Sequence, residues 1–154
     1  MRFGKRLGVD VGDARIGVAS CDPSGMIASP VETVKAGPNA ISRLAELVVE
    51  YEAIECVVGL PLGLSGREGP ASAKVRIFVS ELAQKISPVS VRLVDERMST
   101  ITAQGQLHAS GRNTKNSRSV IDQAAAVVIL QSAIDAEKMR GDAPGELVEA
   151  RTDG

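Results

Sequence analysis

The order of the apolar segments restricts this chain to a small set of folds. Two short runs rich in β-forming residues, LGVDV and RIGVAS, flank the turn-forming residues GDA, and this pattern predicts a β-hairpin. A third strand is expected in SPVETVKA, after the breaker run DPSG. Helical and strand-type segments alternate from residue 39 onward. Such an order predicts an α/β fold in which a mixed sheet carries helices on both faces.

The alternating part of the chain supplies two further strands, so the predicted sheet is five-stranded. ECVVGL is a short apolar run typical of a buried strand, and VSVRLVDE is the next strand along the chain. Asn39 is expected to cap the helix before ECVVGL, and Pro70 to begin the helix after the glycine-rich loop PLGLSGREGP. Two more helices are predicted, STITAQGQLHASG, which ends at Gly111, and the long apolar segment VIDQAAAVVILQSAIDAEKM, which starts at Asp122.

Length and composition fit one ordinary domain. With 154 residues, 44% of them hydrophobic and 24% charged, the chain can bury a normal core. We expect the domain to span residues 1–140 and the polar segment 141–154 to be a disordered tail. No apolar run approaches the roughly 18 residues of a membrane span and no signal segment precedes the first strand, so we expect a cytoplasmic protein with no membrane partner. Cys21 and Cys56 form no zinc or disulfide pattern and are predicted to be reduced.

Carboxylates occur at three places that the predicted fold brings together. Asp10 lies inside an apolar strand, where an unpaired buried charge is costly, Glu96 closes VSVRLVDE, and Asp122 tops the apolar stripe of the last helix. Ligand sites in such sheets form beyond the carboxyl ends of the parallel strands. Carboxylates gathered there favour Mg²⁺ or Mn²⁺, which makes these three residues candidate metal ligands and catalytic residues for metal-assisted hydrolysis of a nucleic-acid backbone. Alternatively, Asp122 is stabilised by its helix N-terminus and Glu96 is an exposed strand-end residue.

Cations gather in one segment although the net charge is only −1. No acidic residue lies between residues 97 and 121, whereas four cations do, and a guanidinium there can bind phosphate oxygens as a planar fork. His108, the only histidine, is expected to be a surface residue. A structural salt bridge is the alternative for Arg15, and a solvated loop is the alternative for the segment 111–119. The candidate substrate-binding residues are Arg15, Arg97, Arg112, Lys115 and Arg118.

Aromatic residues are too few to form a base-stacking surface. Phe3, Tyr51 and Phe78 are the only ones in the chain. Proteins that bind single strands by stacking rely on several aromatic side chains, so this sequence argues against that class. Recognition of backbone shape and charge, as in a structured RNA or a branched DNA, is the expectation.

Four ordered motifs, GVDVGDARIGVA, VVGLPLGLSGREGP, VDERMST and IDQAAAVVILQ, resemble those of the YqgF family, also called RuvX. The resemblance covers about residues 6 to 140 and implies an RNase H-like fold. It also implies an acidic triad that corresponds here to Asp10, Glu96 and Asp122, whereas Asp95 is expected to be structural. The chain departs from the family pattern at Gly63 and Ser65, where members commonly carry Asn and Asp. It departs again where Ala14, rather than Lys, precedes the arginine of the first motif.

The resemblance implies a metal-dependent endonuclease that matures the 5′ end of precursor 16S ribosomal RNA. Resolution of Holliday junctions in branched DNA is the alternative, and it would call for a homodimer because both strands must be cut. A non-catalytic nucleic-acid-binding module in transcription or ribosome assembly is a third possibility. Actin-like ATPases share the GVDVG-type opening, but they require two such domains, and a chain of this length holds one.

Overall fold

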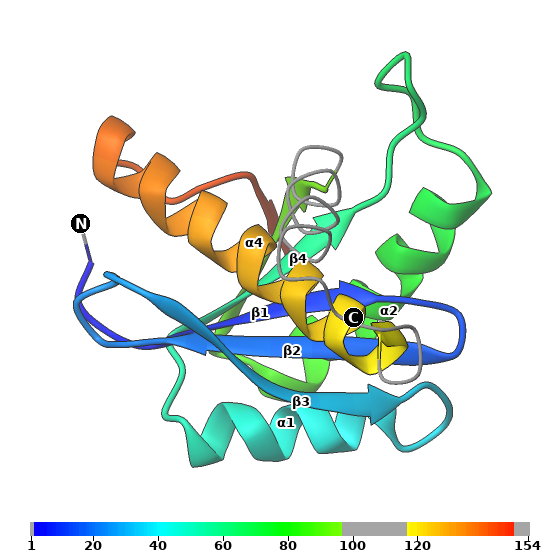
Figure 1. Ribbon diagram of the computed structural model, residues 1–154, viewed down its shortest axis with the longest axis horizontal. Coiled ribbons are helices and arrows are strands. Elements are labelled where there is room, and N and C mark those ends of the chain that lie inside the picture. Colours follow the sequence, from blue (N-terminus) through cyan, green and yellow to red (C-terminus); the bar gives the residue numbers. More distant parts are fainter. Residues whose placement is uncertain (1, 97–116, 150–154) are drawn as a thin grey trace.

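One mixed sheet forms the centre of the protein (Figure 1). The computed structural model describes residues 2–96 and 117–149. The six strands lie in the order β3-β2-β1-β4-β5-β6, with β1, β4 and β5 mutually parallel and the other pairs antiparallel. The predicted mixed α/β sheet is therefore confirmed. The strands are β1 (Arg6–Val11), β2 (Arg15–Cys21), β3 (Ala28–Lys35), β4 (Glu55–Leu60), β5 (Ser90–Asp95) and β6 (Glu146–Val148).

The sixth strand corrects the predicted five-stranded sheet and part of the predicted tail. Residues 146–148 pair antiparallel with β5, where Val148 lies opposite Val91. Gly145 enters this strand with a φ of 67°, and a Cβ there would lie 2.1 Å from the carbonyl oxygen of Leu93. The composition of the segment suggested disorder, but pairing with the edge of β5 is a long-range interaction that local composition does not reveal.

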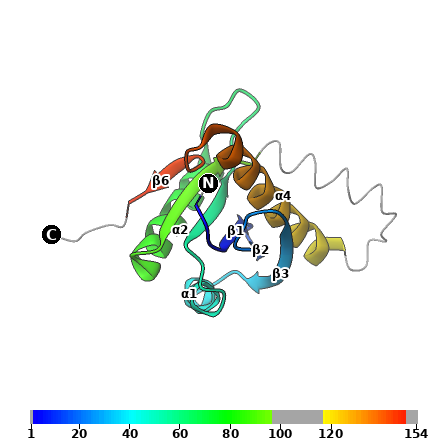
Figure 2. The same cartoon turned by 90° about the vertical axis from the view of Figure 1, so that its left-hand side faces the viewer.

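The helices cover both faces of the sheet, as predicted. They are α1 (Ala40–Glu50), α2 (Pro70–Ile86) and α4 (Ser117–Arg140). Figure 2 shows α4 on one side of the strands β1–β3, while α1 and α2 lie away from it. No helix in the described part of the chain combines the length and apolar character that a membrane crossing needs.

The helix boundaries agree only in part with the sequence predictions. Pro70 begins α2, as expected. Asn39 precedes α1 but makes no side-chain capping hydrogen bond. Asp122 does not start the last helix, because α4 begins at Ser117, within the polar run that we predicted as a loop. The helix includes the end of this polar run, which lacks the apolar spacing that indicates a helix in a sequence. The predicted helix STITAQGQLHASG lies outside the described residues.

The strands alternate between two apolar layers. Leu7, Val9 and Val58 face α1 and α2 in the larger core, while Val57 packs with Leu130 in the layer under α4. The two cysteines are buried and form no disulfide, as predicted, and they belong to different layers. Burial raises the pKa of the Cys56 thiol to about 12, which makes it unreactive near neutral pH.

A network of buried ion pairs closes the end of the sheet where β1 begins. Glu55 and Glu137 are 1% and 3% exposed, and Arg2 binds both, with N–O distances of 2.9 and 2.6 Å. The Arg2 hydrogen bonds outweigh the effect of burial and hold the pKa of Glu137 below its usual range. The network thus fastens the start of the chain to β4 and to the last turns of α4. Its other members are Arg6, Ser90 and Arg92.

Candidate functional site

Strand alternation places Asp10 on the face of the sheet that α4 covers. Leu7 and Val9 point into the larger core, so Gly8 and Asp10, one residue out of phase, face the other way. A Cβ at Gly8 would come within 2.7 Å of the carbonyl oxygen of Ala126 in α4. Asp10 thus lies at the carboxyl end of β1, beneath the first half of α4.

Gly17 brings Asp122 to the same place. It lies opposite Asp10 in the β1–β2 pair. A Cβ at this position would lie 1.9 Å from the carbonyl oxygen of Asp122, so the backbone of α4 rests directly on the glycine. Because no side chain separates the two backbones, Asp122 lies close to Asp10, although 112 residues separate them in the sequence.

Glu96 reaches the site from the parallel side of the sheet. It follows the last residue of β5, and its backbone N–H donates a hydrogen bond of 3.2 Å to the carbonyl oxygen of Leu60 at the end of β4. Its side chain lies against Gly59, where an added Cβ would come within 2.9 Å of Oε2. The carboxyl ends of β1, β4 and β5 therefore converge on one site, as the parallel topology predicts.

Asp10 and Glu96 are in hydrogen-bond contact and share their electrostatic environment. Burial and the neighbouring charge of Asp10 raise the pKa of Glu96 to about 7. Burial also raises the pKa of Asp10, and the charge of Asp122 adds to this effect, while the hydrogen bond with Glu96 opposes it. When the pair carries one proton, Glu96 is therefore the group that holds it, and its O–H donates a hydrogen bond to the Asp10 carboxylate.

Arg15 holds the third carboxylate. Its Nε donates a hydrogen bond of 2.9 Å to Oδ2 of Asp122, and the two side chains are 37% and 20% exposed. The salt bridge considered from the sequence is thus present, which leaves a phosphate contact by Arg15 as a prediction. The Arg15 side chain also remains partly exposed to solvent.

The site brings two carboxyl groups into contact but not all three. In residues 2–96 and 117–149, no group of three His, Cys, Asp or Glu side chains is close enough to enclose a metal ion. Asp122 is near enough for its charge to act on Asp10, yet it is paired with Arg15. The role of the three carboxylates as metal ligands stays a prediction.

Several predicted residues belong to the part of the chain that the structure does not describe. Arg97, His108, Arg112 and Lys115 lie outside the described residues. Arg118 falls within the range of α4, but the description does not extend to its side chain. Asp95 is exposed at the end of β5, and its charge contributes to the raised pKa of Glu96.

Two residues that shape the site are absent from the sequence predictions. Gly17 and Gly59 carry no functional group, yet each provides the space that a carboxylate or its backbone occupies. A glycine inside a strand often marks the close approach of another backbone or a ligand. That signal was present in RIGVAS and ECVVGL, and it would have indicated where the last helix docks.

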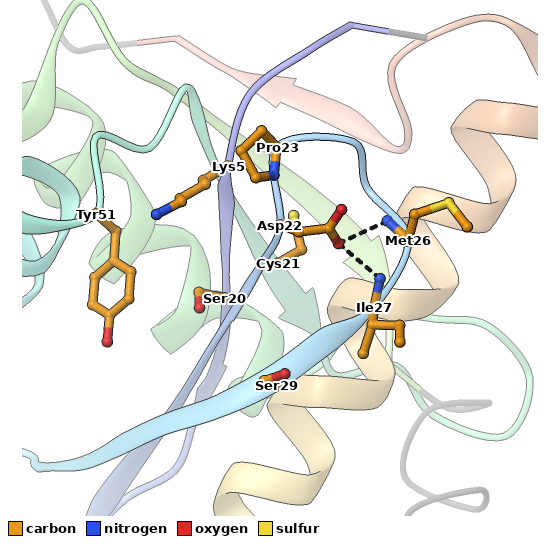
Figure 3. A pocket seen from close by; sticks show the side chains of 9 residues that line it. All are labelled: Lys5, Ser20, Cys21, Asp22, Pro23, Met26, Ile27, Ser29 and Tyr51. Atoms are coloured by element: carbon orange, nitrogen blue, oxygen red, sulfur yellow. Dashed lines mark hydrogen bonds between the residues drawn. The ribbon is translucent and has the colours of Figure 1, made fainter.

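A separate pocket lies near the other end of β1, away from the carboxylates (Figure 3). Lys5, Ser20 and Tyr51 line it, together with the turn between β2 and β3. The Asp22 carboxylate accepts hydrogen bonds of 2.8 and 2.9 Å from the N–H groups of Met26 and Ile27. Asp22 thus shapes this turn, and it is the only carboxylate among the described residues that line the pocket.

The mixed sheet with helices on both faces defines an α/β protein with an RNase H-like fold. Thermus thermophilus RuvC bound to a Holliday junction substrate has a similar structure, with a TM-score of 0.60 at 16% identity over 92% of this chain and 99% of that one. A fowlpox virus resolvase with Holliday junction DNA gives a TM-score of 0.51 at 14% identity, covering 86% and 97% of the two chains. At these identities the likeness establishes the fold alone.

Sequence comparison identifies the family. The RuvX family, described as Holliday junction resolvase, matches residues 4–136, and the chain belongs to it. A relative from Streptomyces coelicolor is 64% identical over 97% of this chain and 90% of its own length. Another, from Streptomyces avermitilis, is 63% identical over 97% of both chains. Both relatives are described as candidate pre-16S rRNA nucleases.

Proposed function

We propose that this chain is an endonuclease that hydrolyses nucleic-acid phosphodiesters with Mg²⁺ or Mn²⁺, and that it acts on the 5′ region of precursor 16S ribosomal RNA. One observation carries the reaction class, namely the contact between Asp10 and Glu96 beside Asp122 at the carboxyl ends of the parallel strands. The substrate rests on the description of two relatives that are 64% and 63% identical to this chain over the aligned residues.

The donor chemistry of the site fits a divalent cation. Two carboxyl groups in contact cannot both ionise without repulsion, and a hard cation with oxygen ligands offsets that repulsion. Asp10, Glu96 and Asp122 would hold the ion. When bound, it supplies an activated water and stabilises the leaving oxygen of the phosphodiester.

The remaining residues of the site position these ligands and the substrate. Arg15 orients Asp122 through its 2.9 Å hydrogen bond, and Leu60 fixes the backbone of Glu96. The partly exposed Arg15 is also suited to a backbone phosphate, since a guanidinium binds phosphate oxygens in a fork. We assign the same role to Arg97, Arg112, Lys115 and Arg118 as the predicted phosphate contacts next to the site.

Resolution of four-way DNA junctions is the second candidate, and the description of the RuvX family favours it. It requires two active sites related by symmetry, hence a homodimer, whereas a monomer suffices to trim an RNA leader. A binding module without catalysis is a weaker candidate, because carboxylates that face phosphates oppose binding.

The test compares cleavage of two substrates by the purified protein. One is a fragment of precursor 16S RNA and the other a four-way DNA junction, each with Mg²⁺ titrated from zero. Asp10→Asn should abolish cleavage. Asp13→Asn is the matched control, because Asp13 has a side chain 94% exposed in the adjacent turn and lies 3.7 Å from the exposed Lys74.

Each outcome selects one candidate. Metal-dependent cleavage of the RNA alone, lost in Asp10→Asn and kept in Asp13→Asn, supports the proposal. Paired cuts in the junction alone would instead favour the resolvase. Binding of either substrate without cleavage at any metal concentration would reject an enzymatic role.

A further inference from the structure

The loop between β4 and α2 carries a fully exposed leucine close to the carboxylates. Leu62 packs against the larger core, but Leu64, two residues later, is 102% exposed. The loop starts at Pro61, directly after the residue that binds the backbone of Glu96. Because a chain spans at most about 3.6 Å per residue, Leu64 lies within roughly 15 Å of the end of β4. In Figures 1 and 2 this loop projects from the body of the protein.

Hydrogen bonds within the loop hold its backbone in a tight turn. The N–H of Gly63 donates to the carbonyl oxygen of Arg67 at 2.9 Å, and the N–H of Gly66 donates to that of Gly63 at 2.8 Å. Gly66 adopts a φ of 83°, which favours glycine in such a tight turn. At the base of the loop, the Ser72 hydroxyl donates a hydrogen bond to the carbonyl oxygen of Pro61. The turn thus presents Leu64 in a defined place.

Ion pairs hold the outgoing side of the loop. Arg76 binds Glu68 at 2.6 Å and Glu146 at 2.8 Å, which connects the loop to α2 and to β6. This leaves Arg67 as the charged residue of the tip, in the stretch LGLSGR. A tip that has a cation and no carboxylate can approach phosphates.

The loop also lies at the same end of the sheet as the carboxylates. Lys74, in the first turns of α2, is 3.7 Å from Asp13 in the turn that follows β1. The helix that ends the loop therefore begins beside the strand end that carries Asp10. A nucleic acid whose phosphate reaches Asp10 and Glu96 would pass this loop within a few base pairs.

We infer that Leu64 is a wedge that inserts between adjacent base pairs of the nucleic-acid substrate beside the scissile phosphate and opens the stack there. Exposed leucine side chains are used in this way by proteins that kink duplexes, which gain contact area from the deformation. The inference deepens the proposed nuclease function and rests on it. It assigns recognition to a distorted or branched helix, which explains how a chain with so few aromatic residues selects a position without stacking.

The test measures base unstacking separately from cleavage. The probe is the precursor 16S RNA fragment, with 2-aminopurine placed at one position at a time, and a four-way DNA junction labelled in the same way. The protein carries Asp10→Asn, so that it binds without cutting. It is compared with the double variants that add Leu64→Ser, Leu64→Met or Val49→Ser. Val49, 77% exposed on α1, is the matched control for loss of an exposed apolar side chain.

With saturating protein, we expect 2-aminopurine emission to rise severalfold at one or two adjacent positions. The rise should persist with Val49→Ser, return with Leu64→Met and vanish with Leu64→Ser. Since burying a leucine side chain changes a binding constant by about tenfold or more, Leu64→Ser alone should slow cleavage by about tenfold. Equal emission with Leu64→Ser, or no rise at any position, overturns the wedge. The proposed function fails separately, if the wild-type chain does not cleave either substrate with Mg²⁺.

Discussion

Substitution of Gly17 by alanine tests whether backbone packing assembles the site. The added Cβ would lie 1.9 Å from the carbonyl oxygen and 2.3 Å from the carbonyl carbon of Asp122. Ordinary contacts are near 3.4 Å or longer, so α4 must move away from β2 by about 1.5 Å. Because both sides of the contact are backbone, we expect the upper part of the usual overpacking cost, about 3 kcal/mol. For a chain of this size, that corresponds to a Tm lower by roughly 6–12 °C.

The same movement should reduce catalysis beyond the effect on stability. Asp122 would move away from Asp10, and a displacement of about 1 Å can cost about 100-fold in rate. Thermal denaturation gives the Tm, and cleavage of precursor 16S RNA at 20 °C below the variant's Tm gives the rate of folded protein. Gly69→Ala is the matched control, because among the described residues, its two chain neighbours aside, none has an atom within 4 Å of its Cβ position. We expect its Tm to change by no more than about 3 °C, as for a residue that only precedes a helix.

Two results would refute this reasoning. A Gly17→Ala variant with the Tm of the wild type would show that α4 does not rest on the strand. A variant with the expected loss of stability but the full cleavage rate would show that the position of Asp122 does not matter for the reaction.

Three further predictions concern charge. Without metal, Asp10→Asn should raise the Tm at pH 8. The reason is that the charge of Asp10 helps to raise the pKa of Glu96 to about 7, so the folded wild type loses stability as pH rises through 7. Below pH 4.5, where Glu96 is protonated in both the folded and the unfolded protein, the difference in Tm should disappear. Glu137→Gln should lower the free energy of unfolding by about 3–5 kcal/mol at pH 7, measured by urea denaturation. The difference from the wild type should shrink below pH 4.5, because the lowered pKa of Glu137 gives the wild type stability that is lost on acidification. Arg15→Ala should lower the cleavage rate at least tenfold but change the free energy of unfolding by about 1 kcal/mol or less, since its ion pair with Asp122 is partly exposed. A cleavage rate that falls only as far as the loss of folded protein explains would contradict a positioning role.

Local patterns were sufficient to predict the main elements. The hairpin around GDA, the buried strand ECVVGL and the start of α2 at Pro70 all follow from residue types within a few positions of each other. The same patterns indicated Asp10, because a charged residue in an apolar strand needs a reason to be there.

Interactions between distant segments were beyond the reach of such patterns. β6 exists because residues 146–148 find the open edge of β5, and nothing in their own composition requires it. The ion pair between Arg15 and Asp122 joins positions 107 residues apart, so the sequence left a salt bridge of Arg15 as one of two alternatives and did not indicate its partner. The contact of Gly17 with α4 likewise depends on which helix covers which strand.

The ion network at the start of β1 also determines when the molecule can be completed during synthesis. Arg2 is synthesised 135 residues before its partner Glu137. Strands β1 to β5 with α1 and α2 can assemble earlier, but the face that α4 covers stays open until α4 itself has been synthesised. Asp122 is part of α4, so the nascent chain lacks one of the three candidate site carboxylates until that helix has been made. The carboxylate site is therefore complete only after α4 has packed on the sheet and Glu137 has paired with Arg2 and Arg6.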